Sequence, residues 1–122
     1  MGRRTRAAAA MLPLPVSEFQ ILLALGDAER HGYGIMQEVA SRTHDEVRLG
    51  PGTLYGSIKR MLATGLIEES DERPDAASDD ERRRYYRITA FGREVAAAEA
   101  RRMERLVAQA RAKRFLGRLE PA

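Results

Sequence analysis

The spacing of apolar residues near the start of the chain predicts a helix over about residues 17–28. Ser17 and Gln20 fit the capping box that opens many helices. The apolar side chains of this helix lie on two sides, and Phe19 and Leu23 make up the second side. We therefore expect one side to face the core and the other to face a second element or a second subunit.

Two more helices are predicted before the middle of the chain. One follows the sequence HGYG and ends near Thr43, and residues 47–49 then form a brief extended piece. The next covers residues 51–64. Pro51 suits its first turn, where a missing N–H is not needed. Gly65 suits the left-handed position that ends a helix.

The helix at 51–64 has two chemically different faces. At about 100° per residue, apolar side chains gather on one side: Leu54, Ile58, Met61 and Leu62. Small and basic residues lie opposite, with hydroxyl residues alongside: Gly56, Lys59, Arg60 and Ala63, with Thr53 and Ser57. Gly56 is an unusual choice, because a glycine inside a helix costs about 1 kcal/mol relative to alanine. Close approach of the backbone to another molecule would explain it, and a DNA groove is the natural candidate.

The second half of the chain predicts a β-hairpin and one long helix. Residues 66–70 and 83–89 form the strands, separated by an acidic loop at 71–82. Residues 90–113 form a helix, which would be about 35 Å long at ~1.5 Å per residue. The protein is thus expected to be mainly α with a small β-hairpin. This order is the winged helix-turn-helix plan, in which the third helix enters the major groove and the hairpin flanks it.

The long helix carries small and apolar residues at heptad spacing. They are Ala96, Ala100, Met103, Val107 and Ala110. A domain of this size cannot cover so long a helix, so we expect a homodimer formed through this seam. Packing against the chain's own first helix is the alternative, because Phe19 and Leu23 give that helix a spare apolar side. Both apolar surfaces are buried if the long helix of one subunit packs around the first helix of its partner.

Composition excludes several classes of protein. The 122 residues include 21 Lys and Arg against 18 Asp and Glu, no cysteine and no tryptophan. With only His31 and His44 as histidines, we expect no metal and no cofactor. No serine has the histidine and acid context of a nucleophile, so we expect no enzyme. The short apolar N-terminal stretch is interrupted by Pro13 and Pro15, which favours a cytoplasmic protein without a membrane span.

Six sequence segments occur in a distinctive order and spacing. They are ILLAL at 21–25, HGYGI at 31–35, GTLYGSIKRM at 52–61, GLIEE at 65–69, RRYYRIT at 83–89 and FGRE at 91–94. Together they resemble the PadR-like transcriptional regulators, especially the short kind with one C-terminal helix. The resemblance implies a homodimeric repressor that binds a roughly palindromic operator near its own or a neighbouring gene. Some relatives respond to phenolic acids or flat drugs, which allows a small-molecule effector, but the missing tryptophan argues against a drug sensor.

The expected DNA contacts lie on the third helix, at the start of the second helix and in the hairpin: Tyr33, Thr53, Tyr55, Gly56, Ser57, Lys59, Arg60, Arg83, Arg84 and Tyr85. Hydroxyl groups can donate to phosphates or base edges, and Arg60 can grip a guanine through two hydrogen bonds. For Tyr33 and Tyr55, simple packing of the ring is an equal alternative. For the hairpin arginines, the alternative to a DNA backbone contact is neutralisation of the adjacent acidic loop.

Four segments are expected: a disordered basic arm at 1–12, the DNA-binding domain at 13–89, the dimerisation helix at 90–116 and a tail at 117–122. The sequence therefore predicts a dimeric regulator that binds double-stranded DNA at an inverted repeat. The alternative is an interaction module that docks on another protein through its C-terminal helix and lacks specific affinity for DNA.

Overall fold

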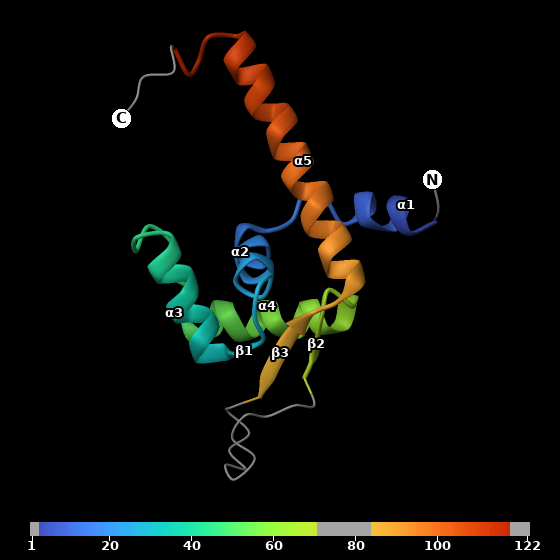
Figure 1. The fold of residues 1–122 in the computed structure, drawn as a ribbon, viewed down its shortest axis with the longest axis vertical. Helices are drawn as coiled ribbons and strands as arrows, with labels where there is room; N and C mark the ends of the chain where they lie inside the picture. The colour runs from blue at the N-terminus through green and yellow to red at the C-terminus, as the bar shows by residue number, and fades with distance from the viewer. Residues whose placement is uncertain (1–2, 71–83, 118–122) are drawn as a thin grey trace.

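Helices make up most of the structure, a computed structural model that describes residues 3–70 and 84–117 (Figure 1). The helices are α1 (Arg3–Ala10), α2 (Val16–Ala24), α3 (Gly32–Arg42), α4 (Pro51–Thr64) and α5 (Ala90–Ala112). The strands are β1 (Arg30–His31), β2 (Ile67–Glu69) and β3 (Tyr85–Ile88). Strand β3 lies between the other two and pairs antiparallel with both. The predicted mainly helical fold with a small hairpin is confirmed, and β1 is a strand that the sequence did not predict.

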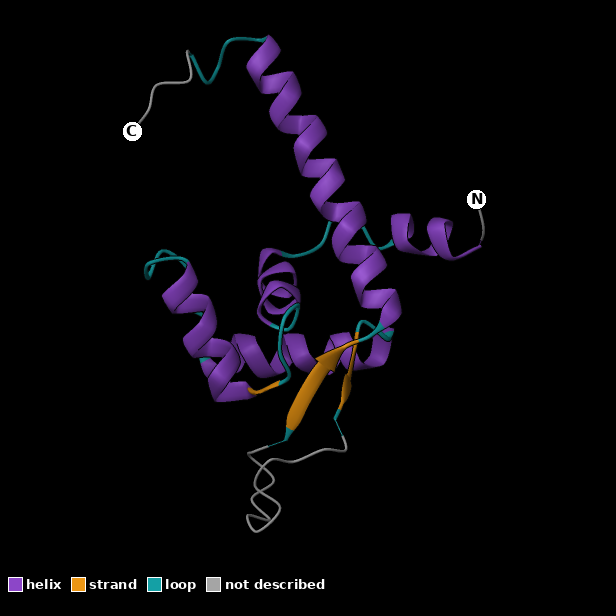
Figure 2. Ribbon diagram, viewed as in Figure 1, coloured by secondary structure: helices purple, strands orange, loops and turns teal. Residues whose placement is uncertain are grey.

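The core lies where α2, α3 and α4 meet the sheet and the first turns of α5. Its fully buried side chains are mostly aliphatic: Ile21, Leu22, Leu25, Ile35, Val39, Leu54, Met61, Leu66, Ile67 and Val95. Each large one contributes about 1.5–3 kcal/mol through burial. Figure 2 shows the small sheet at one edge of this helical body, while the second half of α5 projects away from it.

Helix α4 has the bounds that the sequence predicts. Pro51 stands in its first turn, and Gly65 ends it with a φ of 79° in the left-handed region. Leu54, Ile58 and Met61 are buried as expected. Leu62 is 36% exposed, so its assignment to the buried side is wrong. It lies at the edge of the apolar face, where no other element covers it fully.

The predicted capping box at the start of α2 is wrong. The helix begins one residue earlier, after Pro15, and forms no side-chain cap. The Ser17 hydroxyl instead lies 3.0 Å from the Ser57 hydroxyl on α4. The helix also ends at Ala24 rather than near residue 28, and the Ala24 carbonyl accepts a hydrogen bond of 2.8 Å from Arg30 Nε. At the start of α2, the contact of Ser17 with Ser57 on α4 thus takes the place of the predicted side-chain cap.

Helix α3 begins at the HGYG sequence and ends at Arg42, close to the predicted end. His31 caps it, because its Nδ1 accepts a hydrogen bond of 2.9 Å from the Gly34 amide. His31 therefore has a structural role at the start of this helix. The following residues, 47–49, contain no strand, and Thr43 Oγ1 holds them to α3 by accepting from the Val47 amide at 3.1 Å.

The expectation of a disordered arm at residues 1–12 is wrong, because Arg3–Ala10 form α1. Its alanine run has the highest intrinsic helix propensity. Ala8 is 3% exposed and lies beside Ala97 and Ala98 of α5. Burial of Ala8 against α5 gives this short helix the tertiary contact that a peptide of its length needs.

Two contacts fix the first half of α5 to the body. Thr89 caps α5 by accepting a hydrogen bond from the Gly92 amide at 2.9 Å, and its hydroxyl donates to the Gly65 carbonyl at the end of α4 at 2.6 Å. Glu99 is 2% exposed and accepts a 2.9 Å hydrogen bond from the Leu14 amide. The hydrogen bond from Arg102 lowers the pKa of Glu99 despite burial, and the Leu14 amide lowers it further. The carboxylate therefore stays ionised while it ties α5 to the segment before α2.

Candidate nucleic-acid interface

The outward face of α4 is small, polar and basic. Its residues are Gly52, Thr53, Gly56, Lys59, Arg60 and Ala63. A Cβ added at Gly52 would meet no atom of the described chain within 4 Å, and one at Gly56 would meet Arg60 Nη1 alone, at 3.7 Å. Packing within the described chain therefore requires neither glycine. The face is open to a close-fitting partner.

The first turn of α4 adds backbone donors to this face. Gly50 is the N-cap residue and offers no side-chain cap. The first backbone hydrogen bond of the helix runs from the Leu54 amide to the Gly50 carbonyl at 2.9 Å. The amides of Gly52 and Thr53 precede that bond, so they have no partner within the helix. Together with the helix dipole, such amides suit a phosphate.

Ser57 does not belong to the outward face, and its predicted DNA contact is wrong. It is fully buried, because its side of α4 packs against α2. Its hydroxyl lies 3.0 Å from that of Ser17 and 3.2 Å from Arg60 Nη2. Arg60 remains 60% exposed, but its Nε lies 3.3 Å from the buried Glu18 carboxylate.

Aromatic residues join the start of α3 to the hairpin. His31 stacks on Tyr33 with ring centres 6.5 Å apart, and it meets Tyr85 edge-on at 5.3 Å. Tyr33 is 60% exposed, so its hydroxyl can reach outward. Tyr55 packs closely on Gly32, where an added Cβ would lie 2.5 Å from the Tyr55 hydroxyl oxygen. Packing of the ring therefore accounts for part of the role of Tyr55, and the residue is still 43% exposed.

The described hairpin arginines are partnered by acids of β2. Arg84 Nε lies 3.5 Å from Glu69, and Arg87 Nε lies 2.7 Å from Glu68. Pairs as exposed as these contribute about 0–1 kcal/mol, so a phosphate could replace either acid. Arg83 and the acidic loop at 71–82 lie outside the described residues.

Arg48 is a candidate that sequence reasoning missed. Its side chain is 76% exposed and lines an open groove between α3 and the start of α4, beside Tyr33, Gln37 and Gly50. The available signal was a basic residue two positions before the N-cap Gly50, a place where a cation can meet a phosphate bound by the helix amides.

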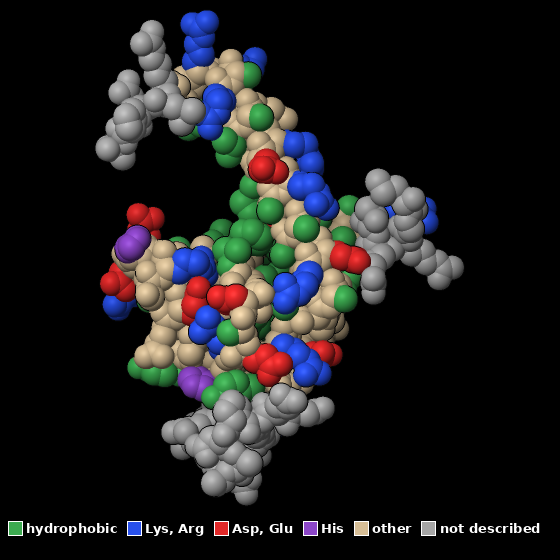
Figure 3. All heavy atoms as spheres, in the orientation of Figure 1, with side chains coloured by type: hydrophobic (Ala, Val, Ile, Leu, Met, Phe, Trp, Pro, Cys, Tyr) green, Lys and Arg blue, Asp and Glu red, His purple; other side chains and the backbone are tan. Residues whose placement is uncertain are grey.

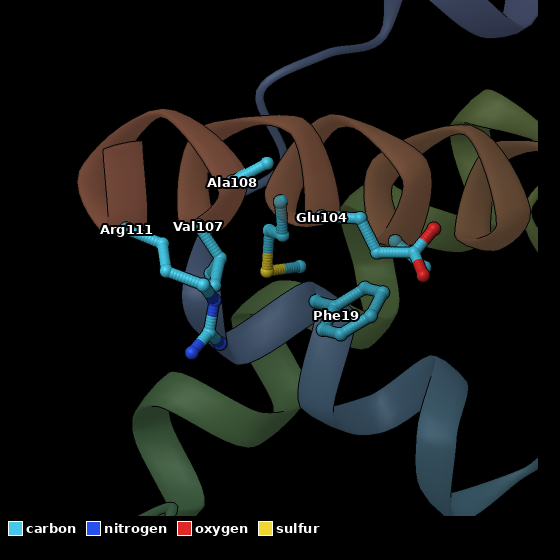
Figure 4. Close-up of a pocket in the computed structure, with 7 residues that line it drawn as sticks. Phe19, Glu104, Val107, Ala108 and Arg111 are labelled. Carbon is cyan, nitrogen blue, oxygen red and sulfur yellow. The ribbon is translucent and has the colours of Figure 1, made fainter. Parts of the chain in front are cut away.

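A second open surface lies between α2 and the projecting half of α5. It is a groove of about 500 Å³ lined by Phe19, Ala100, Met103, Glu104, Val107, Ala108 and Arg111. Figure 4 shows the Phe19 ring facing the side of α5 that carries Val107 and Arg111. Hydrophobic atoms line the angle between α5 and the body in Figure 3. Four of the predicted dimerisation residues therefore meet here.

The other predicted dimerisation residues are arranged differently. Ala96 packs against the protein's own core. Ala110 is partly buried, and Leu23 is 41% exposed. Within residues 3–70 and 84–117, no group of three acidic or histidine side chains could hold a metal ion. No helix in the same ranges is both long and apolar enough to cross a membrane.

A three-helix body with a hairpin beside its third helix is a winged helix-turn-helix, a class of DNA-binding domain. The family description "Transcriptional regulator PadR-like family" matches residues 21–98. The chain belongs to the PadR-like family of transcriptional regulators, as its motifs predict.

Individual relatives agree with this assignment. The chain is 36% identical over 86 residues to the transcriptional regulator Rv3488 of Mycobacterium tuberculosis, an alignment that covers 70% of this chain and 74% of the relative. It is 34% identical over 90 residues to an uncharacterised 37.1 kDa protein of a Streptomyces fradiae transposon, covering 74% of this chain but 24% of that protein. A crystal structure of a PadR family regulator from Clostridium difficile R20291 superposes with a TM-score of 0.67 at 25% identity, covering 84% of this chain and all (100%) of that one.

Proposed function

We propose that this protein is a homodimeric repressor that binds an inverted-repeat operator near its own or a neighbouring gene. The observation that carries the proposal is the outward face of α4. Gly52 and Gly56 leave its backbone uncovered by side chains, although packing within the described chain requires neither glycine. Lys59 and Thr53 flank this backbone with a cation and a hydroxyl. A helix with a thin, basic face of this kind fits the major groove of DNA.

Contacts around the outward face of α4 complete the proposed interface. The amides of the first turn of α4, with Arg48 and Tyr33 nearby, bind one phosphate region. The hairpin binds another through Arg84 and Tyr85, once the phosphate displaces Glu69. Most of these contacts position the protein on the backbone, and α4 reads the bases.

The groove on α5 supports the proposed dimer. Its apolar lining is open in one subunit and includes Val107, which is 45% exposed. A two-fold axis would place the Phe19 of one subunit against the α5 of the other and bury both. The two α4 helices would then enter successive major grooves about 34 Å apart, which sets the spacing of the operator's half-sites.

Selection of bound duplexes from random DNA tests the proposal. We expect an inverted repeat with half-site centres about one helical turn apart. Affinity for the selected duplex should fall steeply with salt, with a log–log slope of roughly −0.9 for each neutralised phosphate. Failure to enrich any sequence, together with little dependence on salt, would refute the proposal. That outcome would favour a module that docks on another protein through α5.

A further inference from the structure

A buried polar network joins α2 to α4 directly beneath the proposed DNA-binding face. Glu18 is 6% exposed and its carboxylate lies 3.3 Å from Arg60 Nε. The fully buried Ser57 hydroxyl lies 3.2 Å from Arg60 Nη2 and 3.0 Å from the Ser17 hydroxyl. Figure 1 shows α2 lying against α4. Glu18 of α2 and Ser57 of α4 thus hold the Arg60 side chain of the recognition helix, and Ser17 of α2 holds the Ser57 hydroxyl.

The network determines the direction of the Arg60 guanidinium. Its Nε donates to Glu18 on α2 and its Nη2 to Ser57 on α4, whereas Nη1 lies 3.7 Å from the position that a Cβ on Gly56 would occupy. The guanidinium is therefore folded back along α4, over the outward face. A guanidinium carries five N–H donors. The network uses one on Nε and one on Nη2, so the edge formed by Nη1 and Nη2 keeps donors for a ligand.

That edge matches a guanine better than it matches a phosphate. Guanine presents two acceptors, O6 and N7, on its major-groove edge, and an arginine binds both through paired N–H groups. A phosphate can also accept two hydrogen bonds from this edge, but the Glu18 carboxylate beside Arg60 would repel its negative charge, whereas a guanine is neutral. An arginine held in one conformation also loses less side-chain freedom when it binds.

We propose that Glu18 and Ser57 are positioning residues that hold Arg60 to read one guanine in each half-site. Arg60 then contributes to sequence specificity, and general affinity for the DNA backbone comes from other cations. This inference rests on the proposed function, because it requires α4 to enter the major groove.

The test uses a duplex selected from random DNA by the wild-type protein. Each guanine is replaced in turn by 7-deazaguanine, which lacks the N7 acceptor, at the same position of both half-sites. We expect one position at which wild-type affinity falls by about tenfold or more. Arg60→Ala should bind the parent duplex more weakly and should be insensitive to replacement at that position.

Glu18→Gln separates positioning from a merely structural role. It should lose most of the dependence on that guanine, while its affinity for scrambled duplexes stays equal or rises because the domain loses a negative charge. Glu18→Gln in the Arg60→Ala background should cause no further loss of discrimination. Glu38→Gln is the matched control, because Glu38 pairs with Arg42 at 2.9 Å on α3 and should leave the guanine dependence unchanged.

The outcomes distinguish the two proposals. If the wild type selects no sequence, the proposed function fails. If it selects a sequence but no guanine depends on Arg60, or if folded Glu18→Gln keeps the full dependence, only the inference about Arg60 is overturned. Should Glu18→Gln fail to fold, Ser57→Ala takes its place. It removes the contact to Nη2, so it should reduce the guanine dependence, and an unchanged dependence overturns the inference.

Discussion

Replacing Gly56 with alanine separates the needs of the fold from those of the DNA-binding face. Gly56 lies inside α4, where alanine is favoured over glycine by about 0.5–1 kcal/mol. The new Cβ would lie 3.7 Å from Arg60 Nη1, an ordinary contact distance, and would meet no other described atom within 4 Å. We therefore expect Gly56→Ala to raise the free energy of unfolding by about 0.5–1 kcal/mol per subunit.

The same methyl group should weaken DNA binding. It would stand on the outward face, where we propose that the bare helix backbone approaches the groove. Insertion of a methyl group into a close-packed contact costs about 1–3 kcal/mol, which corresponds to an increase in Kd of about 5- to 150-fold. Urea denaturation at fixed protein concentration measures the first effect, since the stability of a dimer depends on concentration. Titration of a selected duplex measures the second.

Gly92→Ala is the control, because it makes the same change in a helix where the fold does need glycine. Its Cβ would collide with the backbone carbonyl of Leu66 and would lie 2.9 Å from Ile88 Cγ1. This variant should lose about 1–3 kcal/mol of stability or more. The reasoning about Gly56 is refuted if Gly56→Ala destabilises the fold. It is equally refuted if the variant is more stable and binds the selected duplex as tightly as the wild type.

Four further predictions concern the dimer, the hairpin, acid stability and ligands. Val107→Asp places a charge in the α5 groove and should give monomers or unfolded protein by light scattering; a monomeric wild type would contradict the dimer. Arg84→Ala should weaken cognate and scrambled duplexes alike and reduce the salt slope by about one per subunit, whereas an unchanged slope would mean that Arg84 stays with Glu69. Arg102 lowers the pKa of Glu99 from 4.5, so the stabilisation by Glu99 is present above that ordinary value and is lost as the pH falls through the lower folded-state value. Glu99→Gln should therefore be less stable at neutral pH and lose less stability in acid, as urea unfolding at several pH values can measure. Flat aromatic dyes should bind weakly, since tryptophan is absent; calorimetry that found a sub-micromolar site, saturable at one per dimer, would contradict this.

Local chemistry in the sequence was enough to predict the elements that carry the proposed site. Pro51 and Gly65 mark the ends of α4 because a fixed φ suits a first turn and a left-handed residue suits a helix end. The alternation of residues in β3 and the unbroken run of α5 are likewise properties of neighbouring residues. The order of these elements, with the motifs they carry, identified the family.

Burial and pairing, in contrast, were decided by the tertiary structure. The helical period places Thr53 and Ser57 on the same side of α4. Nevertheless, Ser57 is fully buried because α2 covers it, while Thr53 is exposed. The partner of Arg60 is Glu18, 42 residues away. Strand β1 has two residues and forms because β3 pairs with it. Helix α1 is short, and its alanine run is held by the packing of Ala8 on α5. A helical period shows which residues share a face, but only the packing of distant elements determines which face is covered, and so which side chains remain free to meet DNA.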